Sequence, residues 1–386
     1  MAHSSDILET AWIDEAHLSF ETFKSCVAQT TDTAMCPRAS DITHNIPIYS
    51  GAEIEEMTSG HLNELMAEWT GIFGKGPGVL AIKGAIADPA IIDRATEVFE
   101  TLIEEERGTG GGDHFAKPGA NDRVWNAVQK HAQKDPEGFA RYFSNRTIDL
   151  ASRAWLGDGY QITAQVNRVN PGGAAQTPHR DYHLGFMPNA RMAKFPAHVH
   201  HLSPALTLQG AVAHCDMPVE TGPTMLLPFS QQFTEGYLAF NRPEFQAHFA
   251  QHHVQLPLAK GDMLFFNPAL MHGAGTNITT DTQRMANLLQ VGSAFGRSIE
   301  TVDRTAMMLA LYPCLQNAPF EPEEIDRILA ASTEGYAFPT NLDRDPPVGS
   351  MNPQSQTDIT KQALAQNMPL AEFTALMQAW ENRRRA

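Results

Sequence analysis

Cysteine is scarce in this sequence, and the spacing of the few cysteines excludes two classes of protein. Cys26, Cys36, Cys215 and Cys314 form no C-x-x-C pair and no dense framework. A structural zinc site and a disulfide-stapled scaffold are therefore not expected. The pattern favours a reducing compartment instead.

The sequence also lacks a long apolar segment and an excess of basic residues. Residues 1–6 carry neither the basic start nor the apolar core of a signal peptide, and no stretch has the length and apolarity typical of a membrane span. The chain has 28 Lys and Arg against 44 Asp and Glu, a net charge of −16. It therefore offers no basic field that would collect phosphates. We expect a cytoplasmic protein that binds neither membrane nor nucleic acid.

The predicted type of secondary structure changes twice along the 386 residues of the chain. Helical periodicity dominates both ends, whereas the middle is rich in short β patterns. One helix is expected to begin after Asp88, a favoured N-cap residue that is followed by Pro89. We expect a helical N-terminal extension over residues 1–75, a β-rich domain with packing helices over 76–300, and a helical C-terminal extension over 301–386.

Short apolar runs between turns rich in proline and glycine predict the strands of the middle segment. In residues 160–169 the side chains alternate, so that Gln165 and Asn167 share one face and Val166 lies on the other. The expected strands lie at 78–83, 160–169, 206–215, 225–227, 254–257, 263–266 and 284–291. Their spacing is typical of a jelly roll. The predicted class is α+β, with helices flanking a cupin-like jelly-roll core.

Two histidines and one aspartate form the most informative pattern in the chain. His179 and Asp181 stand two residues apart in the segment PHRDYH, and alternate residues of a strand share a face. His272 follows 93 residues after His179 and supplies a second imidazole. Two imidazoles and one carboxylate are the ligands of the facial triad in non-haem Fe(II) oxygenases. We therefore interpret His179, Asp181 and His272 as catalytic metal ligands.

Arg284 lies 12 residues after His272, at the start of an expected strand. A guanidinium binds a carboxylate through two parallel hydrogen bonds. Arg284 is therefore a candidate for holding the far end of a dicarboxylate cosubstrate whose near end chelates the metal. The alternative is an exposed arginine at the start of a strand.

The stretch 160–291 resembles the phytanoyl-CoA dioxygenase family of Fe(II)/2-oxoglutarate oxygenases. The matching pieces are residues 165–169, 178–183, 220–231, 261–266 and 272–275. The resemblance implies a double-stranded β-helix core and the use of Fe(II), 2-oxoglutarate and O2. It also implies hydroxylation of a C–H bond in a small-molecule substrate, while 2-oxoglutarate is converted to succinate and CO2.

The same resemblance suggests further site residues. Polar residues of the strand 160–169 face the cosubstrate in this family, which makes Gln165 a candidate cofactor-binding residue. Thr224, which follows a Gly-Pro turn, is a second candidate near the metal. Halogenases of related fold replace the carboxylate ligand with a small residue, so the retained Asp181 favours hydroxylation or desaturation over halogenation.

Several alternatives remain open at the level of sequence. His214 and Asp216 form a second H-x-D pair and are a competing ligand set. Residues 198–201 contain three histidines between two prolines and are expected in a surface loop, and residues 108–113 are expected to form a flexible loop or lid. Competing functions are a catalytically silent relative that binds a small molecule, and a cupin-like metalloenzyme without 2-oxoglutarate. The sequence does not identify the substrate, and it leaves open whether the protein forms a homo-oligomer.

Overall fold

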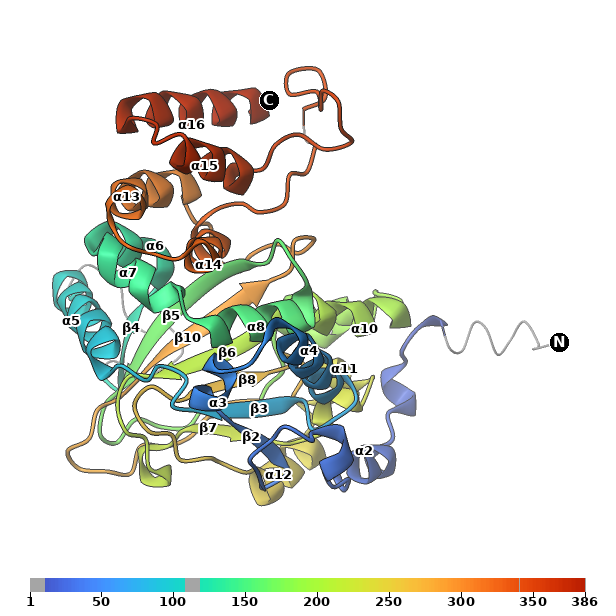
Figure 1. Ribbon diagram of the computed structural model, residues 1–386. Helices are drawn as coiled ribbons and strands as arrows, with labels where there is room; N and C mark the ends of the chain where they lie inside the picture. The colour runs from blue at the N-terminus through green and yellow to red at the C-terminus, as the bar shows by residue number, and fades with distance from the viewer. Residues whose placement is uncertain (1–10, 108–118, 340, 386) are drawn as a thin grey trace.

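The computed structural model describes residues 11–107, 119–339 and 341–385. Its central feature is a mostly antiparallel sheet with eight strands (Figure 1). In spatial order these are β1 (Asp41–Thr43), β2 (Ile46–Ser50), β3 (Val79–Lys83), β8 (Met263–Phe266), β6 (Thr207–Ala213), β10 (Arg284–Gly292), β5 (Gln161–Val169) and β4 (Asn121–Val124). Only the β2–β3 pairing is parallel. The coarse α+β prediction is confirmed.

A second, two-stranded sheet packs against the main one. It consists of β7 (Thr224–Leu226) and β9 (His272–Ala274), which are antiparallel. Single bridges add a segment at each edge, because His179 pairs with His272 and Leu226 pairs with Val254. Leu226 shares an apolar cluster with Leu264 and Phe266 of the main sheet. The space between the two sheets is therefore where the interior side chains meet.

Helices cover the opposite face of the main sheet (Figure 1). The packing helices before β5 are α4 (Ser59–Gly74), α5 (Pro89–Glu106), α6 (Ala127–Lys134), α7 (Pro136–Phe143) and α8 (Arg146–Leu156). As expected, Asp88 caps α5, because its carboxylate accepts a hydrogen bond of 3.0 Å from the amide of Ala90. Ile162, Ala164 and Val166 of β5 join the core beneath these helices. This burial leaves Gln165 and Asn167 on the interior face, as the alternation predicts.

The remaining helices lie at the two ends of the chain and in the connections between strands. They are α2 (Phe20–Val27), α3 (Gly51–Glu55), α9 (Asn189–Met192), α10 (Ala197–Ala205), α11 (Gly236–Ala239), α12 (Pro243–His252), α13 (Arg304–Asn317), α14 (Pro322–Ser332), α15 (Gln356–Ala365) and α16 (Leu370–Arg384). Short 3-10 turns are η1 (Glu15–His17), η2 (Thr33–Met35), η3 (His183–Phe186), η4 (Val219–Thr221) and η5 (Ser230–Gln232). Helices α15 and α16 lie farthest from the sheet (Figure 1).

Some sequence-based expectations need correction. Strands β1 and β2 lie within residues 1–75, where a mostly helical segment was expected, because β3 supplies a hydrogen-bonding edge that local periodicity does not reveal. The expected strand at 254–257 is reduced to the bridge at Val254. Residues 198–201 lie in α10 rather than in a loop, and His200 is buried. The division of the chain at residues 75 and 300 stays a prediction, and the glycine-rich segment at 108–113 lies outside the described residues.

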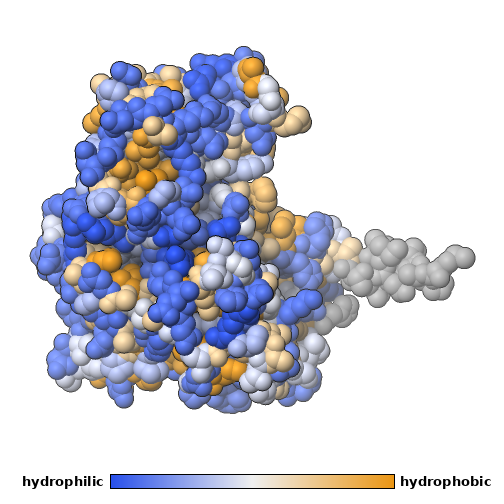
Figure 2. Space-filling model, in the orientation of Figure 1, coloured by the Kyte–Doolittle hydropathy of each residue, from blue (hydrophilic) through white to orange (hydrophobic). Residues whose placement is uncertain are grey.

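No helix in the described segments has the length and apolarity needed to cross a bilayer. The face shown in Figure 2 is mostly hydrophilic, with apolar side chains gathered in small separate groups.

Two buried histidines in the helical layer predict a stability that depends on pH. Burial lowers the pKa of His131 to about 4 and that of His214 to about 3. The unfolded chain protonates them near 6.5, so it binds more protons than the folded chain at lower pH. We expect the free energy of unfolding to fall as the pH drops from about 6.5 towards 4.

The substitution His131→Leu tests this reading by urea unfolding at several pH values. Both ring nitrogens of His131 are buried and have no hydrogen-bond partner among the described residues, and such groups cost about 1–3 kcal/mol each. We expect the variant to be more stable at pH 7 and to lose less stability on acidification. The exposed His201→Gln serves as the control. An acid dependence unchanged by His131→Leu would contradict the assignment.

Candidate metal centre

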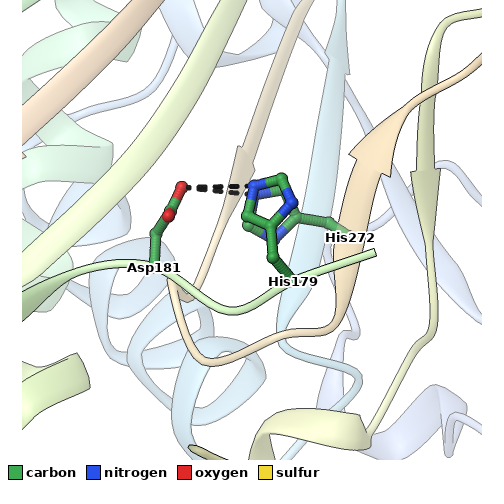
Figure 3. Close-up of side chains that lie close together, drawn as sticks. All are labelled: His179, Asp181 and His272. Atoms are coloured by element: carbon green, nitrogen blue, oxygen red, sulfur yellow. Dashed lines mark ion pairs between the residues drawn. The ribbon is translucent and has the colours of Figure 1, made fainter. Parts of the chain in front are cut away.

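His179, Asp181 and His272 converge in the structure although 93 residues separate the two histidines. Figure 3 shows the carboxylate of Asp181 pointing at both imidazoles. Its Oδ2 atom lies 3.6 Å from Nε2 of His179 and 3.5 Å from Nε2 of His272. One ligand atom from each residue lies within 4.8 Å of the other two. The bridge between His179 and His272 brings these distant segments together.

Backbone carbonyls orient both imidazoles. Nδ1 of His179 lies 2.8 Å from the carbonyl oxygen of Thr177, and Nδ1 of His272 lies 2.8 Å from that of Leu270. Because a carbonyl oxygen only accepts hydrogen bonds, each Nδ1 carries the proton and donates. The lone pair of each Nε2 is therefore directed at the space next to Asp181, which is the arrangement of metal-binding histidines.

The surroundings of Asp181 stabilise the ionised form of its carboxylate. Burial raises its pKa, but the interaction with the adjacent imidazoles of His179 and His272 outweighs burial and holds the pKa well below the usual range. Nε2 of Gln209, on β6, donates a hydrogen bond of 2.9 Å to Oδ2. The hydroxyl of Tyr237 donates to the backbone carbonyl of Asp181 at 2.7 Å. Side chain and backbone of this residue are thus both fixed.

The pKa values of the two histidines move in opposite directions. Burial disfavours the charged form of both rings, and His179 further lowers the pKa of His272. At His179 the interaction with the Asp181 carboxylate outweighs burial, and the pKa of His179 is raised. At His272 the burial dominates, and its pKa is lowered. Two imidazoles and one carboxylate on one side of a common point suit ferrous iron with three coordination positions left for other ligands.

Arg180 lies between the two candidate ligands in sequence but points into the protein on the other side. Its guanidinium is buried, donates to the carbonyl oxygens of Ser230 and Phe233, and lies 5.6 Å from the ring centroid of Tyr237. The contact requires a glycine at position 236, because a Cβ there would lie 1.8 Å from Cζ of Arg180. Arg180 therefore anchors the ligand-bearing segment to η5 and α11.

The substitution Gly236→Ala is expected to displace Arg180 and loosen the ligand segment. Overpacking of a buried site costs about 1–3 kcal/mol, so we expect a loss of stability of this size in urea unfolding and weaker Fe(II) binding in an anaerobic titration. Gly60→Ala in α4 is the matched control, since a Cβ there meets no atom within 4 Å. Wild-type iron affinity in Gly236→Ala would contradict the anchoring role.

Arg284 is buried at the start of β10, with 6% of its surface exposed. Within the described parts of the chain, no carboxylate lies within ion-pair distance of it. Burial lowers the pKa of Arg284 to about 10. The guanidinium remains charged near neutral pH, and a buried charge without a counter-ion is costly. The position therefore favours binding of an anion from outside the chain.

Gln165 and Thr224 occupy interior positions with different surroundings. The carbonyl oxygen of the Gln165 side chain accepts a hydrogen bond of 3.1 Å from Arg123 on β4. Thr224 lies opposite Ala274 in the small sheet, on the same face as Leu226, and is half-buried. Gln165 is thus already engaged with a cation, whereas no hydrogen bond of the Thr224 side chain is found among the described residues.

The competing pair, His214 and Asp216, lies away from the cluster. His214 points into the helical layer, where its ring nitrogens contact the hydroxyls of Thr96 at 2.8 Å and Tyr142 at 3.0 Å. Asp216 is exposed and accepts a hydrogen bond from the amide of Lys260. Among the described residues, one group of three or more His, Cys, Asp or Glu side chains is able to hold a metal ion. It consists of His179, Asp181 and His272.

Sequence reasoning missed two residues that shape the site. Gln209 contacts Asp181, and its place on the interior face follows from the alternation of β6, so the signal was present. Tyr237 comes from a four-residue helix whose position no local pattern reveals. His183, whose role was left open between site and packing, lines the cavity next to the cluster.

Comparisons with known proteins give one family and distant structural likenesses. No curated protein sequence matches the chain. Among solved structures, the non-haem alpha-ketoglutarate-dependent epimerase SnoN from nogalamycin biosynthesis is 20% identical, with 61% of this chain and 82% of that chain covered and a TM-score of 0.42. The carbocyclase SnoK from the same biosynthesis is 18% identical, with 62% and 85% covered and a TM-score of 0.43.

The sequence model of the phytanoyl-CoA dioxygenase (PhyH) family matches residues 75–286, which is more than half of the chain. The matched segment contains all three residues of the cluster and Arg284. Fe(II) and 2-oxoglutarate are the cofactors of this family, and the donor set of the cluster fits iron. The chain belongs to the phytanoyl-CoA dioxygenase (PhyH) family of enzymes that depend on non-haem iron and 2-oxoglutarate.

Proposed function

We propose that this protein is a dioxygenase that hydroxylates a C–H bond of a small molecule, with His179, Asp181 and His272 as the iron ligands. The observation that carries the proposal is the convergence of these three side chains, with both Nε2 atoms and a carboxylate oxygen facing one point. When bound, iron and 2-oxoglutarate use O2 to hydroxylate the substrate while 2-oxoglutarate becomes succinate and CO2.

Arg284 binds the distal carboxylate of 2-oxoglutarate in this proposal. The cosubstrate supplies the counter-charge that this buried guanidinium lacks among the described residues. The unengaged hydroxyl of Thr224 is available for the same ligand. Gln165 acts through Arg123, to which it is hydrogen-bonded, and helps to set the polarity of the interior.

The fine topology supports a double-stranded β-helix, which we propose for the core. Strands β8, β6, β10 and β5 are neighbours in the main sheet. Opposite them, the bridges at His179 and Val254 extend the β7–β9 pair to four neighbouring segments. Two facing layers of four segments are the arrangement of a jelly roll.

Arg284 also separates the proposal from the competing functions. A cupin-like metalloenzyme that does not use 2-oxoglutarate leaves a buried guanidinium without a counter-ion. A catalytically silent relative has no need of two imidazoles with their Nε2 atoms directed at one carboxylate. No observation in the described residues favours either function.

The proposal is tested by slow turnover without substrate. The purified protein is supplied with Fe(II), O2 and 2-oxoglutarate, and succinate is measured with and without an iron chelator. Succinate formed only in the absence of chelator is the expected result. Iron binding without any succinate would favour the silent relative.

A further inference from the structure

A cavity of about 650 Å³ is lined in part by Tyr182 and His183, the two residues that follow Asp181 in the chain. Tyr182, which follows Asp181 directly, lies in one wall, and Gln290 of β10 contributes to the lining. Gln290 pairs across the sheet with Gln209, the residue that donates a hydrogen bond to Asp181. Two residues of the lining are therefore close neighbours of the cluster, Tyr182 along the chain and Gln290 across the sheet through Gln209. Its volume suits a small organic molecule.

Glu300 lines this cavity with a carboxylate that forms no ion pair among the described residues. Its Oε1 atom accepts a hydrogen bond of 2.7 Å from the amide of Asn126. Its Oε2 atom is buried and has no hydrogen-bond partner among the described residues. No cationic side chain of the described chain lies within ion-pair distance of it. Arg123 and Lys130 act on it only from a distance, and burial raises its pKa.

The other polar groups of the lining further restrict the chemical class of ligand that the cavity suits. The side-chain oxygen of Gln290 is also buried and has no hydrogen-bond partner among the described residues, so the wall of the cavity contains a second acceptor without a donor. Arg304 is half-buried and already donates to the carbonyl oxygens of Ile162 and Ala331. Arg297 is exposed at the rim. A single exposed arginine beside a carboxylate is a poor site for a polyanion such as a coenzyme A thioester.

We propose that this cavity receives the substrate and that Glu300 binds a protonated amine of that substrate. An ammonium group donates up to three hydrogen bonds and carries the charge that Glu300 lacks. Tyr182 and Phe186 supply aromatic walls for the rest of a small molecule. The inference rests on the proposed function only in taking the metal cluster as the place of reaction.

The test compares matched probes that differ in one group. The probes are tyramine, tyrosol and 3-(4-hydroxyphenyl)propanoate, and glucosamine, glucose and glucuronate. Their dissociation constants are measured by calorimetry and ligand-observed NMR on the anaerobic protein loaded with Fe(II) and 2-oxoglutarate. We expect the amine of at least one set to bind about tenfold or more tightly than its alcohol and its acid.

The variants show whether Glu300 is responsible. In Glu300→Gln the advantage of the amine should disappear, whereas Glu100→Gln, the same charge change on the exposed side of α5, should retain it. The proposal is overturned if no amine outbinds its alcohol in the wild type, or if Glu300→Gln keeps the preference. The visible band of the iron and 2-oxoglutarate complex, recorded in the same wild-type sample, tests the proposed function separately from the inference about the substrate. A band without amine preference defeats only the inference, and a missing band defeats the proposed function.

Discussion

Alanine in place of His179, Asp181 or His272 is expected to abolish iron-dependent succinate formation while leaving the protein folded. Each substitution removes one of three ligands, and the loss of Asp181 also removes the charge that neutralises the metal. Loss of one such ligand leaves too weak a site to retain iron during turnover. The measurements are bound iron after gel filtration, succinate formation, and the circular dichroism spectrum of each variant.

The competing ligand pair, His214 and Asp216, provides the control for these three substitutions. Asp216→Ala changes an exposed residue and should behave as wild type, and His214→Ala should lose stability through the broken contacts with Thr96 and Tyr142 but retain iron. Succinate formation that survives in Asp181→Ala and vanishes in Asp216→Ala would move the ligand assignment to the second pair.

Arg284→Ala is expected to raise the 2-oxoglutarate concentration needed for half-maximal turnover by about tenfold to a hundredfold. A bidentate bond between a guanidinium and a carboxylate contributes about 1.5–3 kcal/mol, and each 1.4 kcal/mol corresponds to about tenfold in affinity. Iron binding should not change, because Arg284 contacts none of the three candidate ligands in the hydrogen bonds of the described chain. The check is a 2-oxoglutarate titration of succinate formation.

Arg284→Lys refines this prediction. Lysine keeps the charge but not the planar fork of donors, so its requirement for 2-oxoglutarate should lie between those of the wild type and Arg284→Ala. An unchanged requirement in Arg284→Ala would show that the buried guanidinium has a purely structural role.

The parts of the fold that the sequence predicts are those with strong local signals. The helix after Asp88 begins where the cap residue indicates, and the long alternating strands β5 and β10 begin and end within one residue of the expected positions. The short strands β1, β2 and β4 escape prediction because their pairing partners, and not their own residues, stabilise them.

The residues of the candidate site also differ in how strongly the sequence indicates them. His179 and Asp181 are recognisable because ligand chemistry requires particular residue types at a fixed spacing. Glu300 has no such signal, because an acidic residue in a loop is usually exposed, and only the tertiary structure shows its unpaired buried oxygen. Gln209 lies between these cases, since alternation places it on the interior face but not next to Asp181.

The central claim is that His179, Asp181 and His272 hold iron in a form that 2-oxoglutarate chelates. Its most direct test is anaerobic addition of Fe(II) and then 2-oxoglutarate to the metal-free protein, while the weak visible charge-transfer band of the chelate is recorded. We predict that the band forms in the wild type and in Asp216→Ala and is lost in His179→Ala and Asp181→Ala. Iron that binds without producing the band, or a band that persists in Asp181→Ala, would contradict the claim.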